Sequence, residues 1–305
     1  MIDASTRPFT DPARTARGAV RASVALHRLE TLWFNTGTLC NVACVGCYIE
    51  SSPLNDRLAY LGRDEAAGYL AEAAIAYPEL AEIGFTGGEP FMNRDTPGMI
   101  EDALTAGYRV LVLTNAMRPM RRFEAELLTL HARHPGRLAL RVSLDHHSAR
   151  LHEQIRGAGS WAPAIDGLRW LVRHGFTVSV AGRTQWPEPL SDLRAGYAAL
   201  LGELGVSQTA LVLFPEMDAS APVPEITEAC WSILHKDPAS VMCATSRMVV
   251  KRRGATAPVV VACTLLPHDP AFELGATLAE AGGTVALNHR HCARFCVLGG
   301  ASCSV

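Results

Sequence analysis

The chain lacks several features that would assign it to common protein classes. Its 305 residues contain no apolar run near the ~18 residues that a membrane-spanning helix needs. The N-terminal sequence MIDASTRPFTDPARTARGAVRAS has no apolar core of a secretory signal peptide. There is no basic tract and the formal net charge is −2, so a nucleic-acid partner has no electrostatic footprint. These absences predict a cytoplasmic protein with neither a membrane nor a nucleic-acid partner.

Charge is also scarce, whereas cysteine is abundant. Charged residues make up 19% of the chain and hydrophobic ones 49%, which is too apolar for a disordered protein. The length suffices for one large domain and a small one. The chain has nine cysteines. The reducing conditions of the expected cytoplasmic location argue against disulfides between them. Metal binding is then the default interpretation of the clustered ones.

Three of the cysteines, Cys40, Cys44 and Cys47, form a C-x3-C-x2-C loop directly after the strand-like residues 32–34. A [4Fe–4S] cluster has four irons, and thiolates are its usual protein ligands. Three thiolates leave one iron open, and that iron can chelate a small molecule, as a catalytic metal keeps one position free. A structural zinc loop or incidental buried cysteines are the alternatives that the spacing alone leaves open.

A second motif, GFTGGEP, follows the strand-like residues 82–85. Gly87 and Gly88 permit backbone conformations that other residues avoid. Glu89 supplies a carboxylate acceptor, and Pro90 stiffens the exit from the turn. Together with the cysteine loop, this turn makes the chain resemble the radical S-adenosylmethionine (radical SAM) enzymes over about residues 32–214.

The resemblance implies cofactors and a reaction. In that family the cysteine loop holds a [4Fe–4S] cluster, the amino and carboxylate groups of SAM chelate the open iron, and the Gly-Gly-Glu-Pro turn receives the methionine amino group. An external flavodoxin- or ferredoxin-like donor reduces the cluster, and SAM is cleaved to methionine and a 5′-deoxyadenosyl radical. One departure is Gly46, which stands where the family usually has an aromatic residue near the adenine, with Tyr48 two positions later.

Strand-like and helix-like segments alternate over residues 31–216, after an N-terminal extension of residues 1–30. This alternation predicts an α/β fold with right-handed crossovers and a parallel sheet. The resemblance further implies a partial (β/α)6 TIM-like barrel. The expected strands are residues 32–36, 82–86, 109–114, 138–144, 176–181 and 209–214. The expected helices are residues 64–76 with Asp64 as N-cap, 96–106, 120–134, 162–174 and 190–204.

Polar residues follow several expected strands, at the edge where such folds place reactive groups. The resemblance assigns Asn115, Ser143 and Asp145 to SAM binding, and a guanidinium at Arg183 could pair with the SAM carboxylate. Arg156 lies in an Arg-Gly loop like that of the peptide-modifying branches. For each of these residues an N-cap or turn role is the alternative.

Residues 217–305 contain the other six cysteines. Cys243 and Cys263 flank an expected β-hairpin with its turn at residues 253–254, and Cys292, Cys296 and Cys303 form C-x3-C-x6-C. This region resembles a small cysteine-rich twitch/SPASM-like domain, which implies an auxiliary [4Fe–4S] cluster. One cluster drawn from those five cysteines is favoured, and two clusters with three ligands each would use all six. A zinc site including His289 and His291 is the alternative.

The expected reaction is hydrogen abstraction from a small metabolite or peptide, with net oxidation or bond formation assisted by the auxiliary cluster. Cys230 is the candidate catalytic residue for an alternative reaction, a redox-neutral epimerisation. As a hydrogen-atom donor it would serve a redox-neutral epimerase, and otherwise it is a buried apolar thiol. A peptide-modifying maturase, an electron-transfer protein and a zinc-binding module are the further alternatives.

Overall fold

Six strands hydrogen-bond side by side in the order in which they follow one another in the chain. The structure is a computed structural model that describes residues 7–207, 210–215 and 222–300. Each of the six strands pairs in parallel with the next, so the predicted parallel sheet is confirmed. The strands are β2 (Thr31–Asn35), β3 (Glu82–Thr86), β4 (Arg109–Thr114), β5 (Leu138–Ser143), β6 (Thr177–Arg183) and β7 (Leu211–Phe214).

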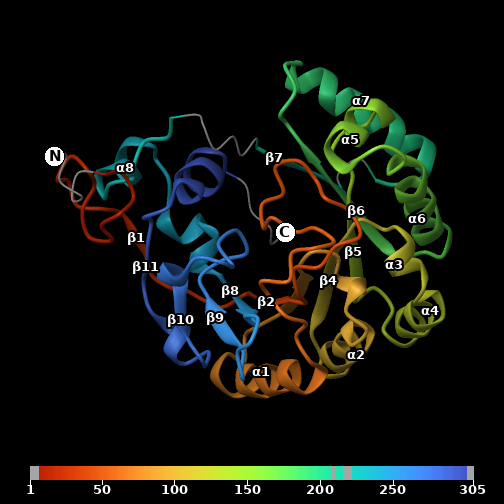
Figure 1. The fold of residues 1–305 in the computed structure, drawn as a ribbon, viewed down its shortest axis with the longest axis horizontal. Helices are drawn as coiled ribbons and strands as arrows, with labels where there is room; N and C mark the ends of the chain where they lie inside the picture. The colour runs from red at the N-terminus through yellow and green to blue at the C-terminus, as the bar shows by residue number, and fades with distance from the viewer. Residues whose placement is uncertain (1–6, 208–209, 216–221, 301–305) are drawn as a thin grey trace.

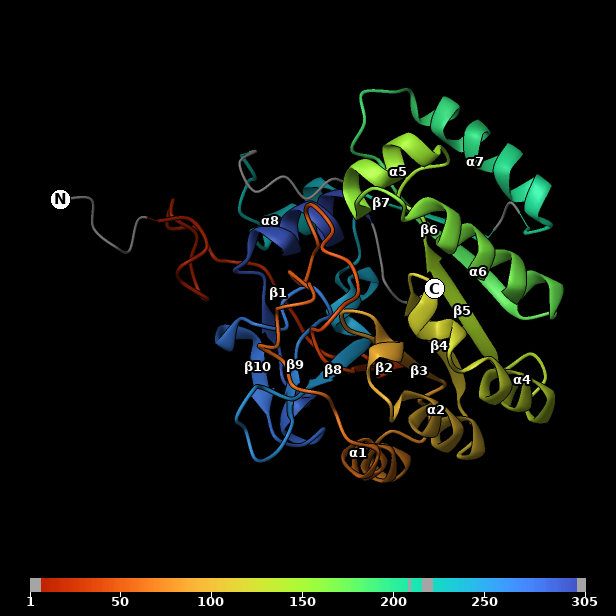
Figure 2. The ribbon, with the colours of Figure 1, turned by 45° about the vertical axis from the view of Figure 1, so that its right-hand side comes forward.

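Helices connect these strands and cover one side of the sheet (Figures 1 and 2). In the helix before β6, Ile165, Leu168 and Leu171 are buried at intervals of three residues, which gives the helix an apolar face. None of the helices in the described residues has the length and apolarity to span a bilayer. The helices are α1 (Arg63–Ala76), α2 (Thr96–Thr105), α3 (Arg118–Arg121), α4 (Glu124–Arg133), α5 (Ala149–Arg156), α6 (Trp161–Arg173) and α7 (Leu190–Leu204).

Two helix predictions differ from the structure. The N-cap of α1 is Gly62, not Asp64, because the Glu65 carboxylate accepts the Gly62 N–H at 2.8 Å and Asp64 lies within the first turn. The single helix expected over residues 120–134 is divided into α3 and α4. Phe123 leaves helical geometry between them, with φ −111° and ψ 25°, and its ring packs against Phe91.

The expected hairpin after residue 243 is present and adds to the same sheet. It consists of β8 (Ser246–Val250) and the antiparallel β9 (Val259–Val261), followed by β10 (Glu273–Gly275). Strand β8 pairs in parallel with β2, so the full sheet has the order β10-β9-β8-β2-β3-β4-β5-β6-β7. The predicted domain boundary at residues 216–217 lies outside the described residues, and the partial (β/α)6 barrel stays a prediction.

The N-terminal residues pack against the C-terminal part of the chain. Strand β1 (Ser23–Val24) pairs with β11 (Val285–Ala286), and Figures 1 and 2 show both near α8 (Ala229–Ile233). Buried Arg21 forms an ion pair with Glu225 at 2.5 Å. Residues 21–24 are therefore held against the part of the chain that contains Glu225 and β11.

Two helical glycines predict opposite effects of the same substitution. A Cβ on exposed Gly68 in α1 meets nothing within 4 Å, whereas a Cβ on buried Gly167 in α6 would lie 1.8 Å from the Ala116 carbonyl oxygen. We expect Gly68→Ala to raise the free energy of unfolding by about 0.5–1 kcal/mol, because alanine loses less backbone entropy. We expect Gly167→Ala to lower it by about 1–3 kcal/mol, because the helix must shift.

Urea unfolding of each variant, prepared without iron and compared with wild type prepared in the same way, measures both changes in the free energy of unfolding. Equal effects of the two substitutions would contradict the packing of α6 against Ala116.

Candidate active site

The glycine turn after β3 packs directly on the start of the cysteine loop. Gly88 N–H donates to the Gly37 carbonyl at 2.8 Å, and Glu89 N–H donates to the Leu39 carbonyl at 3.1 Å. A Cβ on Gly88 would lie 2.2 Å from the Leu39 oxygen. Gly87 has φ +147°, and a Cβ there would lie 2.6 Å from the Gly37 oxygen. Only glycine fits at both positions, so the two sequence motifs form one backbone unit.

One cavity opens at the carboxyl ends of the parallel strands. It is lined by all three loop cysteines and by most positions that were predicted to bind SAM. Those positions are Cys40, Cys44, Cys47, Tyr48, Gly87, Gly88, Asn115, Ser143, Asp145 and Arg183. The structure thus brings together residues from the ends of β2, β3, β4, β5 and β6.

Asp145 is the electrostatic centre of this cavity. Its Oδ2 lies 2.6 Å from Arg156 Nε, and its Oδ1 lies 2.9 Å from Arg183 Nε. Burial raises the pKa of Asp145, but the two guanidinium groups outweigh burial and hold that pKa below its usual value. Two cations share one carboxylate, so this wall carries a net positive charge that suits an anionic group of a ligand.

Arg183 also holds the cysteine loop in place. Its Nη1 donates to the Gly46 carbonyl at 3.0 Å, and its guanidinium lies over the Tyr48 ring, 4.8 Å from the ring centre. Gly46 has φ +64°, a left-handed conformation that favours glycine. The departure from the family pattern at Gly46 thus coincides with a backbone turn that Arg183 stabilises.

Asn115 connects the end of β4 to the same loop. Its Nδ2 donates to Asn41 Oδ1 at 2.8 Å and lies 3.9 Å from Cys40 Sγ. Burial raises the pKa of Cys40 to about 12 and also raises that of Cys44. In the absence of a metal, such burial keeps both groups as thiols. The three cysteines of one short loop line the same cavity, and this donor set fits ligation of a metal cluster, which would displace the thiol protons.

Four more cysteines line a second, apolar cavity. They are Cys243, Cys263, Cys292 and Cys296, from three separate segments, and His291 lies on the same wall. Burial raises the pKa of Cys243 to about 11 and also raises that of Cys292. Three buried thiols and the half-buried Cys263 around one apolar space fit a fully thiolate-ligated cluster. Cys303 lies outside the described residues.

The two cavities share a wall. Thr264 lines the first cavity, Cys263 lines the second, and Leu265 lines both. Aromatic rings add a second connection, because Phe295 packs on Tyr48 at 6.0 Å and on Phe214 at 5.4 Å. Sequence reasoning missed Thr264 and Leu265, since nothing in their local sequence indicates a contact with strands β2 to β6.

Cys230 lies apart from both cavity linings. It belongs to α8, and its Sγ accepts the Thr227 backbone N–H at 3.3 Å. Its role as a hydrogen-atom donor stays a prediction.

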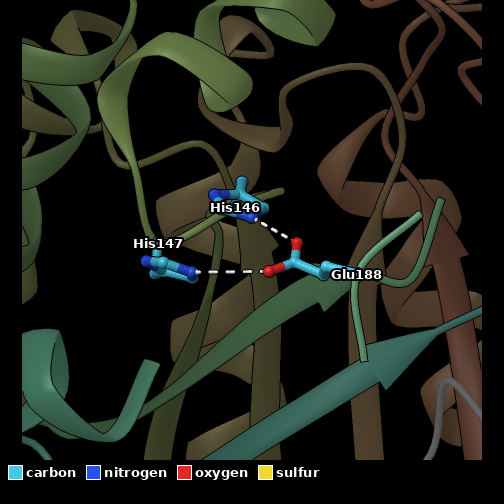
Figure 3. A group of neighbouring side chains, drawn as sticks. All are labelled: His146, His147 and Glu188. Atoms are coloured by element: carbon cyan, nitrogen blue, oxygen red, sulfur yellow. Dashed lines mark hydrogen bonds and ion pairs between the residues drawn. The ribbon is translucent and has the colours of Figure 1, made fainter. Parts of the chain in front are cut away.

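A third cluster of ligand-type side chains follows β5. Figure 3 shows His146 and His147 pointing to the Glu188 carboxylate, with Nε2–oxygen distances of 2.7 Å and 4.0 Å. The Ser148 N–H donates to His146 Nδ1 at 2.9 Å, so the proton of a neutral His146 resides on Nε2 and is donated to Glu188. Metal ligation at Nε2 would require loss of this proton. The group therefore ties the β6–α7 connection to the end of β5.

Residues 34–194 match the family model described as "Radical SAM superfamily". This segment is more than half of the chain. The chain belongs to the radical SAM superfamily. Membership implies a [4Fe–4S] cluster and SAM as cofactors, for which the first cavity provides the three cysteines, and it makes the protein an enzyme.

Curated relatives support the same membership. The chain is 30% identical over 144 residues to the antilisterial bacteriocin subtilosin biosynthesis protein AlbA of Bacillus subtilis, covering 47% of this chain and 30% of AlbA. It is 30% identical to a GTP 3′,8-cyclase of Tolumonas auensis, covering 49% and 43%. It is 27% identical to the mycofactocin maturase MftC of Mycolicibacterium smegmatis, covering 55% and 40%. The chain spans less than half the length of these relatives.

Solved radical SAM structures share the fold. Streptococcus suis SuiB bound to S-adenosylmethionine superposes with a TM-score of 0.61 at 11% identity, covering 82% of this chain and 64% of SuiB. The native anSMEcpe structure with bound AdoMet gives a TM-score of 0.60 at 12% identity, covering 85% and 81%. At this level of identity the likeness shows the fold alone.

Glu89 of this radical SAM enzyme has a role that the motif did not indicate. Its side chain is buried away from the cavity lining, and it accepts hydrogen bonds from Thr114 Oγ1 and Asn115 N, both at 2.8 Å. Burial raises the pKa of Glu89 to about 7, although these donors lower it. The carboxylate thus holds the end of β4 beside the glycine turn, where buried Pro90 begins a 3₁₀ turn. Contact of Glu89 or Pro90 with SAM stays a prediction.

Replacing Glu89 leaves buried donors without an acceptor. We expect Glu89→Ala to lower the free energy of unfolding of the cluster-free protein by about 1–3 kcal/mol, the cost of unsatisfied buried groups. The matched control is Glu126→Ala at an exposed position of α4, which should change it by less than about 0.5 kcal/mol. Urea unfolding followed by circular dichroism measures both, and equal stabilities would contradict the clamping role.

Proposed function

We propose that the enzyme oxidises a C–H bond of a peptide or small molecule, with SAM bound in the first cavity and an auxiliary [4Fe–4S] cluster in the second. The observation that carries this proposal is the shared wall, where Leu265 lines both cavities. An electron acceptor on the far side of that wall can take up the electron of a substrate radical, which makes the net reaction a two-electron oxidation. The epimerase alternative has less support, because Cys230 is among the lining residues of neither cavity in the described part of the chain.

In the first cavity Cys40, Cys44 and Cys47 hold the cluster and leave one iron for SAM. When bound, the cluster supplies the electron that cleaves SAM to methionine and the 5′-deoxyadenosyl radical. Gly87 and Gly88 bring backbone close to the cysteine loop, where the methionine moiety of SAM is received. The proposed partner of the SAM carboxylate is the cationic wall of Arg156 and Arg183 around Asp145. Tyr48, Asn115 and Ser143 complete the proposed SAM site.

In the second cavity the four cysteines Cys243, Cys263, Cys292 and Cys296 suffice for one fully ligated cluster. Their convergence favours one auxiliary cluster over two clusters with three ligands each. Four thiolates also make up a common structural zinc site, so the metal content of the triple variant described below distinguishes iron–sulfur from zinc. A fully ligated cluster has no open iron, so it serves as an electron acceptor and not as a substrate ligand.

The relatives include proteins linked to peptide substrates and enzymes named for a small-molecule substrate, so they support both proposed substrate classes. AlbA takes part in bacteriocin biosynthesis, MftC is a mycofactocin maturase, and SuiB has been crystallised with the precursor peptide SuiA. The GTP 3′,8-cyclases act on a nucleotide. We propose a peptide or small-molecule substrate that binds between the strand ends and Thr264, and a flavodoxin- or ferredoxin-like electron donor.

Reductive SAM cleavage is the direct test of the first cavity. Anaerobically reconstituted protein with dithionite should release 5′-deoxyadenosine from SAM, and Cys44→Ala should abolish it because the cluster loses a ligand. Liquid chromatography with mass detection measures the product. Cys230→Ala is the matched control and should retain cleavage, since Cys230 lines neither cavity. Unchanged cleavage by Cys44→Ala would overturn the proposal.

Iron content tests the second cavity. Reconstituted wild type should hold about eight Fe per chain, and the Cys40/Cys44/Cys47→Ala variant about four. Cys292→Ala should lose about four of the eight, whereas Cys303→Ala should keep all, because the four described cysteines complete the set. About twelve Fe in wild type would favour two auxiliary clusters, and zinc in place of iron in the triple variant would overturn the auxiliary cluster.

A further inference from the structure

A buried arginine contacts the backbone of Cys243, one of the four cysteines that line the second cavity. Arg247, in β8, is 1% exposed, and its guanidinium donates only to backbone carbonyl oxygens among the described residues. Nη1 donates to Cys243 at 2.6 Å and to Ser246 at 2.8 Å. Nε donates to Ala281 at 2.7 Å, and Nη2 donates to Gly283 at 3.0 Å. These carbonyls satisfy the donors but bring no negative charge.

A buried cation without a counter-charge is costly. The buried Arg21 pairs with Glu225, and Arg156 and Arg183 pair with Asp145. Arg247 differs from them. Among the described residues no carboxylate forms an ion pair with it, and its hydrogen bonds all end on backbone carbonyls. An arginine stays protonated in proteins, so a positive charge is buried beside Cys243, one of the four cysteines.

Thiolate ligation of a cluster would supply the missing negative charge. A [4Fe–4S] cluster on four thiolates is anionic, and reduction adds one more elementary negative charge. A nearby buried cation stabilises the reduced form more than the oxidised form, because the low-dielectric surroundings screen little.

We propose that Arg247 is the counter-charge of a cluster held by Cys243, Cys263, Cys292 and Cys296, and that it raises the reduction potential of that cluster. The inference rests on the auxiliary cluster of the proposed function. Arg247 itself lines neither cavity and contacts the second one through the Cys243 backbone, so it is a positioning residue that acts through the cluster. A higher potential makes the cluster a better acceptor for the electron of a substrate radical.

A second cation on the same cysteine group provides a matched comparison. Lys236 Nζ donates to the Cys296 carbonyl at 2.5 Å and to the Val297 carbonyl at 3.0 Å. Like Arg247, it binds the backbone of a candidate ligand. Unlike Arg247, it is partly exposed, so solvent and salt screen its charge. Removing each charge in turn separates a buried counter-charge from a surface one.

The test is a redox titration of the full chain in the Cys40/Cys44/Cys47→Ala background, where the auxiliary cluster is the one iron–sulfur signal. Iron content is measured first, and electron paramagnetic resonance then follows reduction. Arg247→Gln should disfavour reduction about tenfold or more in the equilibrium constant, which for one electron is a shift of ~59 mV to more negative potential. Arg247→Lys, which keeps the charge, should shift it far less. Lys236→Gln should change the constant by less than about threefold.

The outcomes distinguish the inference from the function on which it rests. An iron-free parent variant would overturn the auxiliary cluster and the counter-charge together. An intact cluster whose potential is the same with Arg247→Gln would overturn the counter-charge alone. An equal shift with Arg247→Lys would also overturn it, because loss of hydrogen-bond geometry would then explain the effect. If Arg247→Gln fails to hold iron, the potential of Arg247→Lys is compared with that of the parent, with Lys236→Gln as the control. A potential near that of the parent supports the counter-charge, and a large shift contradicts it.

Discussion

The backbone contact between the glycine turn and the cysteine loop is the constraint on which the active site depends. Gly87 and Gly88 approach the carbonyl oxygens of Gly37 and Leu39 so closely that no side chain fits between them. The parallel pairing of β2 with β3 brings the two turns to the same edge of the sheet, and the glycines then allow them to touch. Glu89 extends this unit to β4 by accepting hydrogen bonds from Thr114 and Asn115. Three strand ends are thereby fixed relative to one another before any cofactor binds.

Charge organises the opposite wall of the cavity. Asp145 at the end of β5 binds Arg183 at the end of β6 and Arg156 at the end of α5. Arg183 also contacts the Gly46 carbonyl and the Tyr48 ring, so the cysteine loop is held both by the glycine turn and by this arginine. The ion pairs of Asp145 and the hydrogen bond to Gly46 hold these side chains in defined positions. Such preorganisation suits chemistry in which a reactive radical must be kept from water and from stray hydrogen donors.

The two cysteine groups are related through one continuous sheet. Strand β8 adds in parallel to β2, and the segment that follows the β8–β9 hairpin carries Cys263, Thr264 and Leu265 to the wall between the cavities. Tyr48, Phe214 and Phe295 bridge the same region with packed rings. The cysteine-rich part of the chain is therefore placed by hydrogen bonds to the core sheet. In this arrangement the buried Arg247 of β8 lies beside Cys243, the position from which we propose that its charge acts on the cluster.

The sequence by itself determined the parallel strand–helix order, the cysteine loop and the glycine turn, because local periodicity and short motifs encode them. It also made metal binding the default prediction for the cysteine-rich region, since the six cysteines there exceed what a core needs. Only the tertiary structure decided which of them converge, because Cys243, Cys263 and the pair Cys292 and Cys296 come from segments far apart in the chain. It likewise decided that Glu89 faces β4, that Arg183 binds Asp145 and Gly46, and that Thr264 borders the first cavity. These are contacts between distant segments, and a one-dimensional pattern carries no record of which buried groups meet in three dimensions.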